Sequence, residues 1–112
     1  MKKCNVLNAM GLFGKKWTFV IVEQISLHNN SGFNPLLKKI KNISPKVLSS
    51  RLKDLEERGL IINNIENSLR SRYILSQKGE EIFKILKELK LWNSKYSENC
   101  YNKECADCEL LN

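Results

Sequence analysis

The chain has 112 residues, with 19 Lys and Arg against 12 Asp and Glu, so its formal net charge is +7. One domain of this size buries a core large enough to fold without disulfides. No apolar run approaches the roughly 18 residues that a membrane span needs, and no segment has the layout of a signal peptide. We therefore expect a soluble, cytoplasmic protein.

The positive charge is concentrated in the first two thirds of the chain. The formal net charge is +6 over residues 1–43, +3 over residues 44–79 and −2 over residues 80–112. A basic body with a mildly acidic last third suits a polyanionic partner such as nucleic acid. Solubility alone also explains a basic surface, so the charge favours this partner without deciding it.

The first well-marked elements are helices. From Lys16 to Leu27 the apolar residues cover most of a helical wheel, which predicts a helix buried on nearly all sides. After "HNNSG", which has the composition of a loop, "FNPLLKKI" predicts a short helix. Asn34 is its expected N-cap, with Pro35 at the first helical position.

The helix from Ser44 to Arg58 has signals at both ends. Ser44 is an N-cap residue, Pro45 takes the first helical position, and Gly59 follows as the stop signal. Three leucines form a core stripe on this helix: Leu48, Leu52 and Leu55. The opposite face carries Lys46, Ser49, Ser50, Lys53 and Glu57.

Two strands and a long helix complete the predicted order. Leu60 to Ile65 and Arg72 to Leu75 are β-branched and apolar, and a polar loop joins them, which predicts a hairpin. Ser76 caps a helix from Gln77 to Tyr96 that would be roughly 30 Å long. So small a body cannot cover its wide apolar stripe. We expect part of it to pack on another chain, through Leu86, Leu89, Trp92 and Tyr96.

This order predicts a winged helix-turn-helix: a mainly α-helical (α+β) fold with a small β-hairpin wing. A helix that offers small hydroxyls flanked by lysines can enter the major groove of DNA closely. The residues that we expect to enter the groove are Lys46, Ser49, Ser50 and Lys53. Phosphate contacts are expected from Ser44 and Arg51, and wing contacts from Arg70 and Arg72.

Four segments stand in an order and spacing that resemble the HxlR family of winged-helix transcription regulators, over about residues 4 to 93. They are "LFGKKWTFVIVEQI", "GFNPLLKKIKNISPKVLSSRLKDLEERGLI", "RYILSQKGEEI" and "LKLW". The resemblance implies a homodimer, joined through its first and last helices, that binds an inverted repeat in double-stranded DNA. Many members also carry a Cys-Pro near the N-terminus, and in some that cysteine senses electrophiles or oxidants. Here Cys4 is followed by Asn5.

The remaining cysteines, Cys100, Cys105 and Cys108, lie within the last thirteen residues. We predict a DNA-binding and dimerisation domain at 1–97 and a cysteine-rich tail at 98–112. The tail has the spacing of the first three ligands of a plant-type iron-sulfur cluster, and its Cys-x2-Cys is also common in zinc sites. Cys4 is a candidate fourth ligand. A thiol-disulfide switch and an inert tail are the competing interpretations.

The sequence therefore predicts a DNA-binding transcriptional regulator, responsive through its cysteines to redox state, electrophiles or a metal. We expect no catalysis, because the one histidine, His28, lacks an evident nucleophile and base set. The alternative is an adaptor that uses the winged-helix scaffold to bind partner proteins. The operator, the target genes, the direction of regulation and the small-molecule effector have no signature in the sequence.

Overall fold

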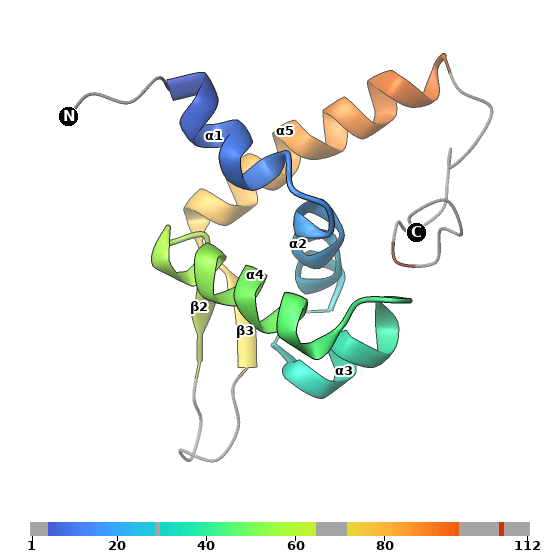
Figure 1. The fold of residues 1–112 in the computed structure, drawn as a ribbon. Helices are drawn as coiled ribbons and strands as arrows, with labels where there is room; N and C mark the ends of the chain where they lie inside the picture. The colour runs from blue at the N-terminus through green and yellow to red at the C-terminus, as the bar shows by residue number, and fades with distance from the viewer. Residues whose placement is uncertain (1–4, 29, 65–71, 97–105, 107–112) are drawn as a thin grey trace.

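The computed structural model describes residues 5–28, 30–64, 72–96 and 106 (Figure 1). Within these residues the elements are α1 (Asn5–Phe13), α2 (Thr18–Leu27), β1 (Ser31–Gly32), α3 (Phe33–Lys39), α4 (Pro45–Glu57), β2 (Ile61–Asn63), β3 (Arg72–Leu75) and α5 (Gln77–Ser94). This order confirms the predicted winged helix-turn-helix, in which α3 and α4 form the helix-turn-helix and β2 and β3 the wing. The predicted boundary near Ser97 stays a prediction, because the structure describes only Ala106 of the residues beyond Tyr96.

Helix α2 lies at the centre of the molecule. Thr18 and all residues from Val20 to Ile25 are buried, as the apolar wheel predicts, although the helix begins at Thr18 and not at Lys16. Helices α1, α4 and α5 and strand β3 all pack against it. A helix covered on so many sides fixes the positions of its neighbours relative to one another.

The sheet has three antiparallel strands in the order β1-β3-β2. The hairpin of β2 and β3 is confirmed, with Ile61 opposite Leu75 and Asn63 opposite Tyr73. No sequence pattern predicts β1, which lies in the segment interpreted as a loop. This strand forms because the backbone of Ser31 pairs with that of Tyr73, a contact between residues far apart in sequence.

The prediction that Asn34 caps α3 is wrong. The helix begins at Phe33, two residues before the predicted first position at Pro35, and Gly32 holds the N-cap position without a side-chain hydrogen bond. Strand β1 runs directly into the helix, so the position of the strand fixes where α3 begins. On the inner side of this segment Leu36 and Ile40 are buried, and Leu37 is half-buried.

The start of α5 is closely fitted to the body. Ser76 is its N-cap, as predicted, and accepts a hydrogen bond from the Gly79 N–H at 3.0 Å. Gly79 lies so near the backbone of Leu60 that a Cβ atom there would come within 2.0 Å of the carbonyl oxygen. Only a residue without a side chain allows this approach, so the start of α5 is fixed beside the start of the wing.

Farther along, α5 is joined to α2 by polar and aromatic contacts. Lys90 Nζ lies 2.9 Å from Glu23 Oε2, and the two side chains are only 19% and 8% exposed. The rings of Phe19 and Phe83 stack with their centroids 6.1 Å apart. The helix ends at Ser94, two residues before the predicted end at Tyr96.

Candidate nucleic-acid interface

Helix α4 begins and ends where its sequence signals predict. Ser44 Oγ accepts a hydrogen bond from the Val47 N–H at 3.1 Å, and Pro45 follows the cap. Past the other end, Gly59 adopts a φ of 74°, a conformation that favours glycine. The predicted core stripe of Leu48, Leu52 and Leu55 is buried, so the opposite face of α4 is turned to solvent.

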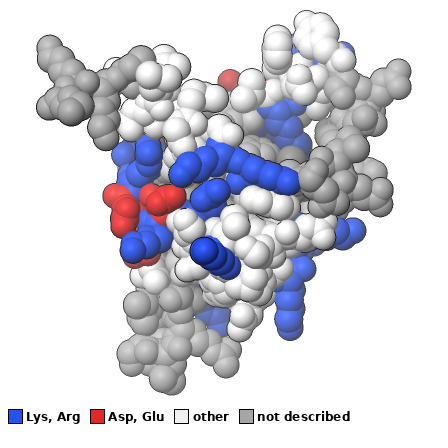
Figure 2. Space-filling model, in the orientation of Figure 1, with Lys and Arg blue, Asp and Glu red and all other residues white. Residues whose placement is uncertain are grey.

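That solvent face carries the four side chains predicted to enter the groove. Lys46, Ser49, Ser50 and Lys53 are all exposed. Figure 2 shows Lys and Arg side chains across the side of the molecule on which α4 lies, with acidic side chains gathered at one edge. Glu56 and Glu57 are exposed in the last turn of α4. On this face the acidic side chains therefore lie at the C-terminal end of α4, while Lys46 lies in the first turn, where the helix dipole is positive.

The predicted phosphate and wing residues have different surroundings. Ser44 uses its oxygen to cap α4 and keeps its hydroxyl proton for another acceptor. Arg51 is half-buried, and its Nε donates a long hydrogen bond, 3.5 Å, to the carbonyl of Lys16. Arg72 is half-buried on β3. Arg70 lies outside the described residues.

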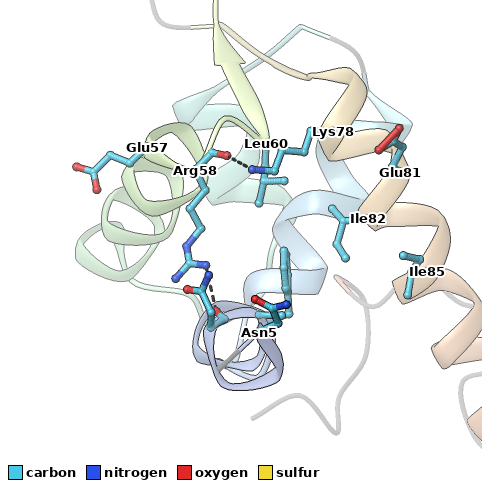
Figure 3. Close-up of a pocket in the computed structure, with 11 residues that line it drawn as sticks. Asn5, Glu57, Arg58, Leu60, Lys78, Glu81, Ile82 and Ile85 are labelled. Atoms are coloured by element: carbon cyan, nitrogen blue, oxygen red, sulfur yellow. Dashed lines mark hydrogen bonds between the residues drawn. The ribbon is translucent and has the colours of Figure 1, made fainter. Parts of the chain in front are cut away.

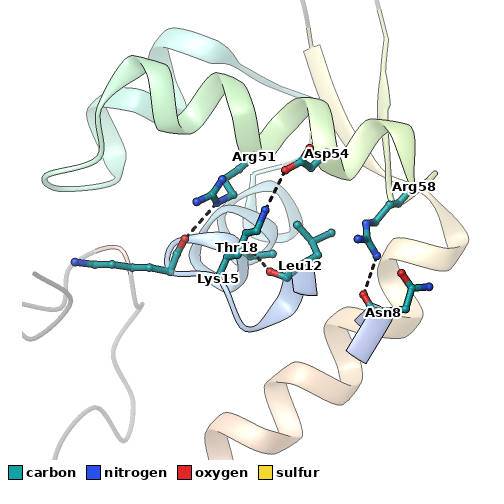
Figure 4. A network of polar contacts seen from close by, with 8 residues as sticks. Asn8, Leu12, Lys15, Thr18, Arg51, Asp54 and Arg58 are labelled. Atoms are coloured by element: carbon teal, nitrogen blue, oxygen red, sulfur yellow. Dashed lines mark hydrogen bonds and ion pairs between the residues drawn. The ribbon is translucent and has the colours of Figure 1, made fainter. Parts of the chain in front are cut away.

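Polar contacts tie one flank of α4 to α1 and to the connection between α1 and α2 (Figure 4). Besides Arg51, Asp54 lies 3.8 Å from Lys15 Nζ, and Arg58 Nη1 donates to the Asn8 carbonyl at 3.1 Å. The partners stand about 35 to 50 residues apart in the chain. No local pattern predicts such pairs, and the sequence interpretation missed them.

A second surface is apolar and lies on α1 and α5. Of the residues predicted to pack on another chain, Leu89, Trp92 and Tyr96 are 58%, 56% and 76% exposed, and Leu86 is half-buried. Helix α1 also exposes three apolar side chains that were not predicted from the sequence, Val6, Leu7 and Met10. Val6 and Leu7 precede Met10 by four and three residues, a spacing that places all three side chains on one face of a helix. This spacing is a sequence signal that could have identified them. In Figure 1, α1 and the far end of α5 lie opposite the β2–β3 hairpin.

An open pocket of about 600 Å³ lies between α1, the end of α4 and the start of α5 (Figure 3). Two cationic side chains line it, and both are bonded to backbone: Arg58 to Asn8, and Lys78 Nζ to the Arg58 carbonyl at 3.0 Å. Ile82 and Ile85 add apolar surface. The hydrogen bonds at this pocket connect α4 to both α1 and α5.

The cysteine predictions fall outside the part of the chain that the structure describes. This holds for Cys4, Cys100, Cys105 and Cys108. Among the described residues, no three His, Cys, Asp or Glu side chains are grouped to hold a metal ion. No helix in the same residues is both long and apolar enough to cross a membrane.

The cap of α4 yields a first prediction. Replacing Ser44 by Ala leaves the Val47 N–H without its side-chain acceptor, and we expect the free energy of unfolding to fall by about 1 kcal/mol. Ser49→Ala, on the exposed face of the same helix, is the matched control and should change stability by less than about 0.5 kcal/mol. Urea denaturation measures both, and equal decreases would contradict the capping role.

Comparison with known proteins agrees with this geometry. Residues 12–101 match the family model of the HxlR-like helix-turn-helix. The "Uncharacterized HTH-type transcriptional regulator YvaP" of Bacillus subtilis is 32% identical over 90 residues, which cover 79% of this chain and 82% of the relative. A possible HxlR family transcriptional factor from Thermoplasma volcanium has a TM-score of 0.72 at 28% identity, over 88% of this chain and 90% of that one.

A third similar protein is the HTH-type transcriptional regulator YodB of Bacillus subtilis, 27% identical over 93 residues, or 81% of this chain and 82% of YodB. Its solved structures include reduced, quinone-bound and diamide-treated forms. The quinone-bound form has a TM-score of 0.69 at 26% identity, over 80% of this chain and 96% of that one. The chain belongs to the HxlR-like helix-turn-helix family and is a DNA-binding regulator of transcription.

Proposed function

We propose that the protein acts as a homodimer that binds an inverted repeat in double-stranded DNA, with one α4 in the major groove of each half-site. The observation that carries this proposal is the solvent face of α4. It presents two lysines and two serines, while the opposite face is held in the core by buried leucines. Arrangement of two α4 helices about a two-fold axis matches a palindromic site.

The side chains of this face have the sizes that groove entry needs. The major groove is about 12 Å wide, roughly the diameter of a helix with its side chains. Ser49 and Ser50 let the α4 backbone come close to base edges and offer hydrogen bonds there. Lys46 and Lys53 then reach guanine edges or phosphates.

The remaining predicted contacts surround this helix. The Ser44 hydroxyl proton and the terminal nitrogens of Arg51 are donors for backbone phosphates. Arg70 and Arg72 extend the contact along the wing. Phosphate contacts fix the register of the protein, whereas the residues on the α4 face supply the choice of sequence.

Removing the two groove lysines should weaken DNA binding. In Lys46→Ala with Lys53→Ala, we expect lower affinity for duplex DNA and a shallower dependence of log K on log salt, by about 0.9 for each phosphate that the protein no longer neutralises. Lys84→Ala with Lys87→Ala removes the same charge from exposed positions on α5 and is the control. Fluorescence anisotropy over a salt series measures both.

Equal binding by the two double variants would reject the groove assignment. A wild-type protein without any salt-dependent duplex binding would favour the adaptor alternative instead.

We propose that the dimer forms through the apolar faces of α1 and α5. Burial of apolar surface is the main favourable term in association, and α5, a helix of 18 residues, exposes Leu89 and Trp92, with the exposed Tyr96 just beyond its end. Helix α1 exposes apolar side chains as well, so it can contribute to the same interface. The resemblance to the HxlR family also implies contact through the first and last helices.

A charge placed on this face should dissociate the dimer. We expect Leu89→Glu to shift the protein toward the monomer and to weaken binding to an inverted repeat more than to an isolated half-site. Gln77→Glu, an exposed site at the start of the same helix, adds the same charge and should remain a dimer. Sedimentation velocity at several concentrations reports the masses, and an unchanged mass for Leu89→Glu would contradict this interface.

We propose that the cysteines make DNA binding responsive to oxidants or electrophiles. Support comes from YodB, for which quinone-bound and diamide-treated structures exist. In the sequence of this chain, Cys4 directly precedes the first helix, and three more cysteines follow the last one. A metal or cluster at Cys100, Cys105 and Cys108, completed by Cys4, is the competing proposal.

A thiol count separates the two proposals. If thiol chemistry regulates the protein, anaerobically purified protein should show four free thiols per chain, fewer after diamide, and weaker DNA binding that dithiothreitol restores. The variant with all four cysteines changed to Ser should bind DNA, and diamide should not change its affinity. About one zinc per chain, or an iron-sulfur absorption spectrum, would reject the thiol switch in favour of the metal site.

A further inference from the structure

We propose that the α1–α2 connection, residues 14–17, forms a second DNA-binding surface, at which Lys15 and Lys16 bind backbone phosphates beside the groove that α4 enters. This inference rests on the proposed placement of α4 in the major groove. It adds two residues that are not among the DNA contacts proposed above.

The connection lies on one flank of α4 (Figure 4). The Lys15 ammonium is 3.8 Å from the Asp54 carboxylate, and the Lys16 carbonyl accepts the hydrogen bond from Arg51 Nε. At 100° per residue, Arg51 and Asp54 occupy the sector of α4 between the buried leucine stripe and the solvent face. Both residues are half-buried, as expected for a flank that another segment covers.

Backbone hydrogen bonds run through the whole connection. The N–H groups of Gly14 and Lys15 donate to the carbonyls of Met10 and Leu12 at 2.9 and 3.0 Å. Thr18 then donates twice to earlier residues: its N–H donates to the Lys15 carbonyl, and its buried Oγ1 donates to the Leu12 carbonyl at 2.9 Å. The two lysines therefore project from a well-defined backbone, so little ordering is needed when they bind a partner.

The backbone of Trp17 shows that the conformation of the α1–α2 connection is held by the surrounding structure. Its φ is 82°, in the left-handed region that a bulky residue rarely adopts. Such strain persists only where neighbouring contacts determine the backbone, and it is found preferentially at functional sites. The indole ring also lies 4.9 Å from Lys16 Nζ, a cation–π contact that directs the ammonium.

Both lysines remain accessible to an external anion. Their side chains are exposed, and the pair of Lys15 and Asp54 is 47% and 35% exposed. An exposed pair at such a distance adds little stability, so a phosphate can take the place of the carboxylate at small cost. The cation–π contact of Lys16 leaves its N–H donors free for phosphate oxygens.

Phosphate is the ligand that this position favours. A helix nearly fills the width of the major groove, so segments on its flanks meet the sugar-phosphate walls and not the base edges. Lysine binds phosphate as a compact point charge. Lys15 and Lys16 would therefore add affinity for any duplex sequence, while the solvent face of α4 supplies the choice of sequence.

The test uses the full chain and a 30-base-pair duplex of random sequence, with fluorescence anisotropy over a salt series. We expect Lys15→Ala with Lys16→Ala to make the slope of log K against log salt shallower by about 0.9 for each phosphate left without its lysine, or about 1.8 per protomer. Lys16→Gln keeps the Lys15–Asp54 pair and should flatten the slope by about half of that. Lys16→Arg should retain the wild-type slope.

Lys84→Ala with Lys87→Ala is again the charge-matched control. If the Lys15 and Lys16 variants behave like this control while Lys46→Ala with Lys53→Ala still flattens the slope, the second surface is rejected and the groove assignment stands. A wild-type protein that does not bind the duplex at all overturns both. Should the double variant not fold, as judged by circular dichroism, Lys16→Gln alone decides between these outcomes.

Discussion

The burial of α2 is the constraint on which the rest of this structure depends. Because nearly every side of this helix is covered, the elements that cover it cannot move independently of it. Helix α4 packs on α2 and presents the groove-facing side chains, while α5 packs on α2 and carries the exposed apolar surface. One buried helix thus fixes the angle between the DNA-binding face and the proposed dimer surface.

The junction of α2 and α5 is where that angle is set. Glu23 and Lys90 are both mostly shielded from water, and each supplies the opposite charge beside the other. The ring stack of Phe19 and Phe83 adds an apolar contact beside the ion pair. In the proposed dimer, this junction determines the distance between the two α4 helices, and with it the spacing of half-sites.

Local signals predicted the elements that carry them. Ser44, Pro45 and Gly59 placed α4 correctly because each satisfies or terminates backbone hydrogen bonding within one turn of the helix. β-Branched and apolar residues on both sides of a polar loop placed the hairpin, and β3 has the predicted bounds. Asn34 failed as a cap because the pairing of β1 with β3, and not the composition of the segment, decides where α3 begins.

The sequence by itself determined the winged-helix order, the solvent face of α4 and the apolar stripe of α5, since each follows from periodicity and end signals inside one element. Only the tertiary structure placed Lys15 and Lys16 beside α4, set Arg51 against the α1–α2 connection and paired Glu23 with Lys90. These contacts join residues about 35 to 67 positions apart. Helical and strand periods describe neighbours within an element, whereas such partners meet only when the chain packs around α2.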